Sequence, residues 1–172
     1  AYLDHVSLAL PRPERLAGLR VAVDCANGAM TGHAPRLLER LGFEVTTIAA
    51  EPDGCNINRG CGSTHPEGLA EHVRARGIRF GVAFDGDADR IGVYDSHGNF
   101  VDSHHVILLL IHYLVKYKKI SGKVVVAFSV TSKVKKLCEA YGLDYQVTQI
   151  GFKYICEIMV NEEVLLGGEE SG

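Results

Sequence analysis

The chain has 172 residues, of which 47% are hydrophobic and 19 are glycine, a composition typical of an ordinary soluble α/β protein with a buried core. Its 18 basic and 21 acidic residues give a net charge of −3, with no basic stripe for nucleic acid and no polybasic patch for a membrane surface. The longest strongly apolar run, Val106–Ile111, is too short to cross a bilayer. The sequence therefore predicts neither nucleic acid nor a membrane as a partner.

Cysteine usage indicates a reducing compartment. The five cysteines are odd in number and include no Cys-x-x-Cys pair, which is typical of reduced cytosolic thiols. No basic segment followed by an apolar stretch marks a signal peptide at the N-terminus. The spacing of Cys55, Cys61, His65 and His72 matches no compact zinc pattern. We therefore expect a cytoplasmic protein whose cysteines are buried or incidental.

Strands and helices are predicted to alternate through the first hundred residues. The β-branched run Leu19–Val23 is predicted to be a strand, and the Asn27–Gly28 turn joins it to a helix. That helix begins near Thr31 or His33 and ends near Gly42. The next predicted elements are a strand at 43–48, a long polar loop, a helix from Pro66 or Glu67 capped by Ser63 or Thr64, and strands at 78–84 and 91–94.

The same alternation begins again close to Asp102, where we place a domain boundary. The predicted elements are a helix at 104–117, a strand at 123–128, a helix at 132–141, a strand at 144–149, a helix through Met159 and a strand at 163–166. We expect polar or surface roles for the histidines of the first of these helices, His104, His105 and His112. Strands that alternate with helices of about ten residues predict parallel β-α-β units.

The predicted fold is therefore α/β, with two successive mixed, mainly parallel units of the α/β/α type. We assign residues 1–102 to the first unit and residues 103–172 to the second. The chain stops inside a glycine-rich loop, so we expect the second unit to be incomplete at its C-terminal end. Strand edges left open in this way favour a dimer of the chain.

Three carboxylates at alternate positions, Asp85, Asp87 and Asp89, precede Arg90 in the turn between two predicted strands. In an extended segment the outer two would lie roughly 13 Å apart, too far to share an ion. A tight turn, for which Gly86 supplies backbone freedom, can bring all three oxygens together. Converging carboxylates repel one another unless a hard cation lies among them, and oxygen ligands suit Mg²⁺ or Mn²⁺. We therefore predict a metal loop at the end of a strand, where α/β sheets usually bind ligands.

The acidic turn admits other interpretations. It could be a solvated loop, because Asp and Gly favour turns in any case. An EF-hand is excluded, because Arg90 and Ser96 stand where it requires Gly and Glu. An aspartyl phosphatase would use Asp85 as the nucleophile, but its pattern requires Thr or Val where this chain has Asp89. The acidic pair at 169–170 could imitate the second acidic pair of such an enzyme, so this alternative stays open.

The order of several motifs resembles the α-D-phosphohexomutase superfamily over nearly the whole chain. The metal loop Asp-Gly-Asp-Ala-Asp-Arg (85–90) is followed by Gly-Phe-Lys-Tyr (151–154) and then by Gly-Glu-Glu-Ser-Gly (168–172), which is similar to the family's sugar-recognition loop. The strings at 52–58 and 62–67 also look like this family. The resemblance implies that the chain covers the second and most of the third of four domains.

The resemblance also implies an activity and a cofactor. Family members are isomerases that shift a phosphoryl group between carbons 1 and 6 of a hexose phosphate, through a phosphoserine and a bisphosphorylated intermediate. Asp85, Asp87 and Asp89 would hold Mg²⁺, which neutralises charge on the transferring group. Arg90 would add positive charge beside the phosphoryl oxygens, or would form a structural pair with one of the aspartates.

The resemblance further implies that Lys153, Glu169 and Ser171 bind the sugar. These residues favour a phosphoglucomutase or phosphomannomutase, whereas the strings at 56–58 and 62–65 look more like phosphoglucosamine mutases. The family's phosphorylated serine lies in a Ser-His-Asn-Pro context that this chain lacks. We therefore expect the remaining domains of a full-length enzyme to supply it, and the chain alone to be inactive. A non-catalytic module that binds metal or sugar phosphate is the alternative of another class.

Overall fold

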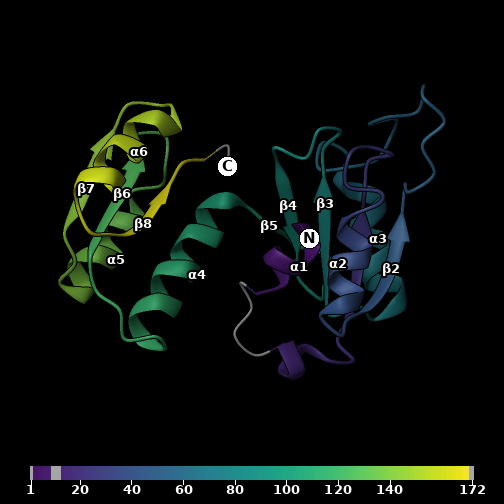
Figure 1. Ribbon diagram of the computed structural model, residues 1–172, viewed down its shortest axis with the longest axis horizontal. Coiled ribbons are helices and arrows are strands. Elements are labelled where there is room, and N and C mark those ends of the chain that lie inside the picture. The colour runs from purple at the N-terminus through teal and green to yellow at the C-terminus, as the bar shows by residue number, and fades with distance from the viewer. Residues whose placement is uncertain (1, 9–12, 171–172) are drawn as a thin grey trace. The chain divides into compact units, whose positions relative to one another are not determined.

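The computed structural model describes residues 2–8 and 13–170, and the chain divides into two compact units, Ala1–Val101 and Asp102–Gly172 (Figure 1). Each unit contains one sheet with helices packed on both faces. The α/β fold predicted from the sequence is confirmed. In the part of the chain that the structure describes, no helix is long and apolar enough to cross a membrane.

The first unit is built on a five-stranded mixed sheet. Its elements are α1 (Tyr2–Ser7), η1 (Pro13–Leu16), β1 (Arg20–Asp24), α2 (Ala34–Arg40), β2 (Glu44–Ile48), α3 (Pro66–Arg76), β3 (Phe80–Phe84), β4 (Ile91–Tyr94) and β5 (Phe100–Val101). The strand order is β2-β1-β3-β4-β5. The first three strands are parallel, and β4 and β5 continue the sheet in antiparallel fashion. The carboxyl ends of β1, β2 and β3 therefore share one edge of the sheet.

The two faces of this sheet follow from the alternation of side chains along β1. Val21 and Val23 belong to a buried cluster that contains Ala34 of α2. Ala22 points the other way, into a cluster with Leu69 of α3. One helix therefore covers each face of the parallel part of the sheet.

The start of α3 differs from its sequence prediction. The helix begins at Pro66, where a missing backbone N–H costs nothing. The predicted cap at Ser63 or Thr64 is wrong, because the N-cap is His65 and its side chain makes no capping hydrogen bond. The backbone N–H of Ser63 instead donates to the carbonyl oxygen of Phe84 at 2.9 Å. The residues before α3 are therefore tied to the end of β3.

The second unit has a three-stranded parallel sheet. Its elements are α4 (Ser103–Lys116), β6 (Lys123–Ala127), α5 (Lys133–Tyr141), β7 (Tyr145–Thr148), α6 (Phe152–Asn161) and β8 (Val164–Gly168). The strand order is β7-β6-β8, with β6 in the centre. The N-cap of α4 is Asp102, whose carboxylate accepts a hydrogen bond from the backbone N–H of His105 at 2.8 Å.

Helices cover both faces of this second sheet as well. On one face, α4 and α5 bury a common apolar cluster against β6. The last two residues of β8 show that α4 and α6 lie on opposite faces. A β-carbon at Gly168 would lie 3.2 Å from Ile107 of α4, and one at Gly167 would lie 2.5 Å from Ile155 of α6. The helices therefore approach the end of β8 closely enough that glycine suits both positions.

Candidate functional site

The acidic loop is the tight connection between the antiparallel strands β3 and β4. Inside it, the backbone N–H of Ala88 donates to the carbonyl oxygen of Asp85 at 3.2 Å, and Ala88 adopts a left-handed φ of 64°. One carboxylate oxygen from each of Asp85, Asp87 and Asp89 lies within 4.8 Å of the other two. The turn thus brings the three predicted metal ligands to one point.

Arg90 lies against the buried member of this group. Asp85 is only 2% exposed, and its carboxylate accepts hydrogen bonds from Nε of Arg90 at 2.9 Å and from the backbone N–H of Arg90 at 3.2 Å. Burial alone would raise the pKa of Asp85, but the hydrogen bonds from the Arg90 backbone and guanidinium outweigh it and hold the pKa below its usual value. Of the two roles considered for Arg90, the structure shows the pair with an aspartate.

The raised pKa of Asp89 reflects the repulsion among the three carboxylates of the loop. Its pKa is raised, first because it shares a hydrogen bond with the Asp85 carboxylate and also because the charge of Asp87 is close. A cation placed among the three oxygens would remove this repulsion. Three carboxylates with no nitrogen or sulfur ligand form a donor set for a hard divalent ion, so the residues present fit Mg²⁺.

Two segments from elsewhere in the first unit support the metal loop, and sequence reasoning did not find this role. The backbone N–H of Ala29 donates to the carbonyl oxygen of Gly86 at 2.8 Å. A β-carbon at Gly28 would lie 2.3 Å from that same oxygen, and one at Gly86 would lie 2.7 Å from the side chain of Ile57. The Asn-Gly turn after β1 is the available sequence signal, but it predicts only a turn. Its contact with the metal loop is a tertiary feature.

Two of the predicted sugar-binding residues lie in one corner of the second unit. The carboxylate of Glu169 accepts a hydrogen bond from the backbone N–H of Gly151 at 3.1 Å, which ties the residues after β8 to the start of α6. Lys153 lies in the first turn of α6, exposed, with Nζ 4.8 Å from the centre of the Tyr154 ring. Ser171, the third predicted residue, lies outside the described residues.

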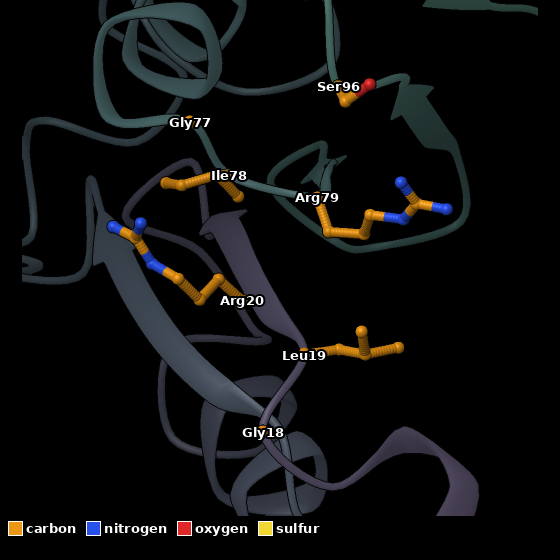
Figure 2. Close-up of a pocket in the computed structure, with 7 residues that line it drawn as sticks. All are labelled: Gly18, Leu19, Arg20, Gly77, Ile78, Arg79 and Ser96. Atoms are coloured by element: carbon orange, nitrogen blue, oxygen red, sulfur yellow. The ribbon is translucent and has the colours of Figure 1, made fainter.

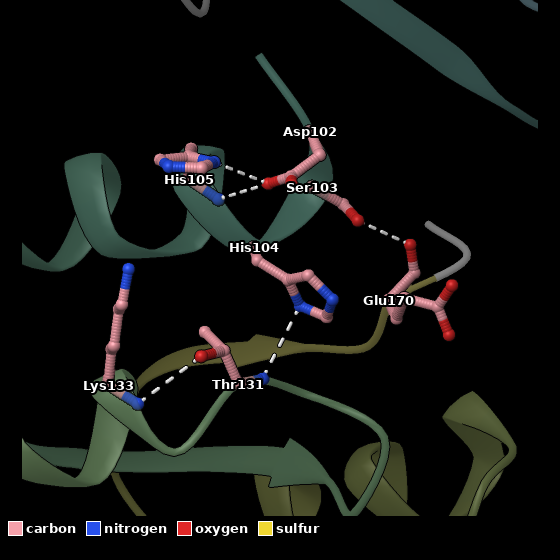
Figure 3. A network of polar contacts seen from close by, with 7 residues as sticks. All are labelled: Asp102, Ser103, His104, His105, Thr131, Lys133 and Glu170. Carbon is pink, nitrogen blue, oxygen red and sulfur yellow. Dashed lines mark hydrogen bonds and ion pairs between the residues drawn. The ribbon is translucent and has the colours of Figure 1, made fainter. Parts of the chain in front are cut away.

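Figure 3 shows two further ties in this corner of the second unit. The hydroxyl of Ser103, at the start of α4, donates to the carbonyl oxygen of Glu170. Nδ1 of His104 accepts a hydrogen bond from the backbone N–H of Thr131 at 3.4 Å, so the imidazole has a polar partner as expected. The residues after β8 are thus tied both to α4 and, through Glu169, to α6.

Figure 2 shows a hollow of about 310 Å³ beside the start of β1 and the residues before β3. The acidic loop follows the other end of β3, so the hollow lies at the opposite end of the sheet. It is lined by Gly18, Leu19, Arg20, Gly77, Ile78, Arg79 and Ser96. The guanidinium groups of Arg20 and Arg79 point away from each other, so they do not converge on a common anion. The acidic loop, and not this hollow, is the candidate site of the first unit.

Comparison with protein families assigns both units. Residues 1–98 match the model of phosphoglucomutase/phosphomannomutase α/β/α domain II, and residues 102–172 match the model of domain III. The chain therefore belongs to the phosphoglucomutase/phosphomannomutase family. The resemblance inferred from the order of the motifs is confirmed.

Individual relatives are similar along the same span. The phosphoglucosamine mutase of Gluconacetobacter diazotrophicus is 40% identical over 172 residues, which are 99% of this chain and 38% of the relative. The phosphoglucosamine mutase of Desulforudis audaxviator is 43% identical over 162 residues, 93% of this chain and 36% of the relative. The chain thus spans less than half the length of the curated relatives that it matches.

Solved structures agree with this assignment. A Thermus thermophilus protein assigned as a phosphomannomutase superposes with a TM-score of 0.81 at 31% identity, covering 99% of this chain and 40% of its own. A phosphoglucomutase/phosphomannomutase family protein from Burkholderia thailandensis gives a TM-score of 0.82 at 22% identity, covering 99% of this chain and 38% of its own. At 22% identity, the likeness to the Burkholderia thailandensis protein concerns the fold alone.

Proposed function

We propose that this chain is the metal-binding and sugar-binding part of a phosphoglucosamine mutase. The observation that carries the mutase proposal is the convergence of three carboxylates, in a chain of this family, on one point at the end of β3. The choice of substrate is supported by relatives named phosphoglucosamine mutase that are 40–43% identical to the chain. The family match gives no support to the aspartyl phosphatase alternative.

The residues of the metal loop would have distinct tasks. Asp85, Asp87 and Asp89 would hold Mg²⁺, which when bound supplies charge neutralisation to the phosphoryl group. Arg90 would keep Asp85 ionised and oriented, because two of its N–H groups already donate to that carboxylate. We assign Arg90 this supporting task in place of direct contact with substrate.

The second unit would bind the hexose phosphate. A carboxylate can accept several hydrogen bonds, so Glu169 can hold the N–H of Gly151 and also accept from a sugar hydroxyl. Lys153, in the same corner, would supply positive charge, and Ser171 stays a prediction. The phosphoserine would come from the remaining domains of the full-length enzyme, so we propose that the chain alone has no mutase activity. A dimer of the chain and a cytoplasmic location also stay predictions.

A phosphoglucomutase or phosphomannomutase is the second candidate. The predicted preference for these substrates is not confirmed, and the observation in its favour is the 31% identity to the Thermus thermophilus protein. Binding of glucosamine 6-phosphate, glucose 6-phosphate and mannose 6-phosphate to the chain, followed by NMR, separates the two. We expect the amino sugar to bind most tightly and to shift the resonances of Lys153 and Glu169. Preferential binding of glucose or mannose phosphate would favour the second candidate.

An activity assay tests the proposal that the chain alone has no mutase activity. A mutase assay with Mg²⁺ and a hexose 1,6-bisphosphate activator should show no turnover by the 172-residue chain. Turnover that depends on Mg²⁺ would contradict the need for a phosphoserine from another domain.

A further inference from the structure

Two carboxylates are buried in the part of the chain that the structure describes, Asp24 at 1% and Asp85 at 2% exposure. Asp85 pairs with Arg90, whereas no basic side chain among the described residues forms an ion pair with Asp24. Asp24 ends β1 and lies in register opposite Ala83 of β3. It is therefore adjacent to the strand that leads into the metal loop. A buried carboxylate is costly unless hydrogen-bond donors compensate it.

Backbone N–H groups provide that compensation. Oδ1 of Asp24 accepts from the N–H of Ala26 at 2.9 Å, and Oδ2 accepts from the N–H of Gly62 at 2.8 Å. Burial raises the pKa of Asp24, and these two donors oppose the shift. Each oxygen thus holds a different segment, the turn after β1 or the loop before α3.

Both segments continue directly onto the metal loop. One residue beyond Gly62, the N–H of Ser63 donates to the carbonyl oxygen of Phe84 at 2.9 Å. Beyond Ala26, the N–H of Ala29 donates to the carbonyl oxygen of Gly86 at 2.8 Å. The carbonyls on either side of Asp85 in the chain are therefore held by the two segments that Asp24 joins.

The turn after β1 needs such a partner. Ala26 and Asn27 both have left-handed backbone angles, with φ of 53° and 49°. Asparagine tolerates this conformation, but it is unfavourable for alanine and persists at Ala26 because surrounding contacts hold it. The hydrogen bond from Ala26 to Asp24 is one of these contacts. A single-acceptor side chain at position 24 could not hold the Ala26 and Gly62 donors with separate oxygens.

We infer that Asp24 is a positioning residue for the metal loop: it fixes the two segments that hold the backbone on both sides of Asp85. This inference rests on the proposed Mg²⁺ site. Asp24 itself need not touch the ion or the substrate. Its effect on the metal passes through the backbone of Phe84 and Gly86.

The first test is the substitution Asp24→Asn, which keeps the size of the side chain and replaces one acceptor oxygen by an NH₂ donor. Calorimetric titration of the folded chain with Mg²⁺ should show an affinity about tenfold weaker, the scale typical of losing a partner behind a metal ligand. Asp95→Asn is the matched control. Asp95 also accepts backbone N–H groups, from His97 at 2.8 Å and Asn99 at 2.9 Å, but in the β4–β5 turn at the far end of β4. Mg²⁺ affinity should stay close to the native value in this control.

A second measurement needs no substitution and therefore covers the case in which Asp24→Asn does not fold. Coupling between two sites is reciprocal, so if the Asp24 contacts favour Mg²⁺ binding, Mg²⁺ must favour those contacts. Hydrogen exchange of the Ala26 and Gly62 amides in the native chain should slow when Mg²⁺ is added. The His97 and Asn99 amides, bonded to Asp95, should not change.

The outcomes separate this inference from the proposed function. Unchanged Mg²⁺ affinity in folded Asp24→Asn, or unchanged exchange at Ala26 and Gly62, would overturn the positioning role of Asp24. The proposed metal site would still hold in that case, provided that the native chain binds Mg²⁺. If the native chain binds no Mg²⁺ at the acidic loop, the proposed metal site fails and the inference fails with it.

Discussion

The metal loop of the first unit and the residues after β8 in the second unit both follow the carboxyl end of a parallel strand, yet they are organised differently. All three predicted metal ligands lie in one turn of the chain, and a hydrogen bond inside the turn brings them together. The corner around Glu169 is instead assembled from α4, α6 and β8 by Ser103 and Gly151. Similar positions in a β-α-β fold can therefore hold one local site and one composite site.

The comparison also indicates which substitutions each region tolerates least. The metal loop has its ligands close together in the sequence, but its backbone is held from outside by Ala29 and Ser63. The corner of the second unit depends on side-chain hydrogen bonds between distant segments, among them those of Ser103 with Glu170 and of Glu169 with Gly151. We expect substitutions that crowd the backbone to destabilise the metal loop strongly. We expect loss of the Glu169 carboxylate to destabilise the second unit only slightly.

The largest effect is expected for Gly28→Ala. Its β-carbon would lie 2.3 Å from the carbonyl oxygen of Gly86, so one of the two backbones has to move. We expect a loss of about 1–3 kcal/mol in the free energy of unfolding, and Mg²⁺ binding should weaken with it. Chemical denaturation and Mg²⁺ titration measure both. Gly32→Ala, where a β-carbon meets nothing within 4 Å, is the control, and equal behaviour of the two variants would contradict the predicted contact.

Asp87→Asn should abolish stabilisation by Mg²⁺. Asp87 is exposed, so its replacement should change the stability of the metal-free chain little, while one of three ligand charges is lost. At a Mg²⁺ concentration of about 100 times Kd, the native chain should gain about 2.7 kcal/mol by linkage. Thermal melting with and without Mg²⁺ tests this. An undiminished melting shift in the variant would show that the ion binds elsewhere, and Asp144→Asn, exposed in the second unit, should keep the native shift.

The affinity for Mg²⁺ should fall as the pH is lowered. The pKa of Asp89 is raised in the metal-free loop, so protons compete with the ion at a higher pH than for an ordinary aspartate. The pH dependence of folding stability in the absence of Mg²⁺ has opposite signs for Asp89 and Asp85. The raised pKa of Asp89 contributes stability at low pH that is lost as the pH rises through it, whereas the lowered pKa of Asp85 contributes stability that is lost as the pH falls through it. Titrations of the native chain at several pH values should show this competition, and an Mg²⁺ affinity that does not change as the pH is lowered would contradict it.

The smallest effect is expected for Glu169→Gln. The carboxylate accepts the N–H of Gly151 at the start of α6, where a negative charge is worth about 0.3–1 kcal/mol. Denaturation should reveal a loss of that size, with weaker binding of glucosamine 6-phosphate and unchanged Mg²⁺ affinity. Glu157→Gln, exposed on α6, is the control. A change in Mg²⁺ affinity would contradict the assignment of Glu169 to sugar binding and not to the metal site.

The sequence alone determined the order of most strands and helices, the turn that holds the three aspartates, and, through the order of its motifs along the chain, the family. It did not predict the helices α1 and η1 that precede β1. The helices, strands and turn depend on patterns within a few residues, such as β-branched runs, Asn-Gly turns and carboxylates at alternate positions. A correct local pattern is sufficient for them because the chain segments involved are neighbours along the sequence.

Only the tertiary structure decided how the metal loop is held. Asp24 and Gly62 are 38 residues apart, and their hydrogen bond has no local signature. The same holds for Ser63, which a local rule assigns as a helix cap although its backbone binds Phe84. Side-chain propensities report which local conformations are favourable, whereas a buried carboxylate takes whichever N–H groups the packed fold brings to it.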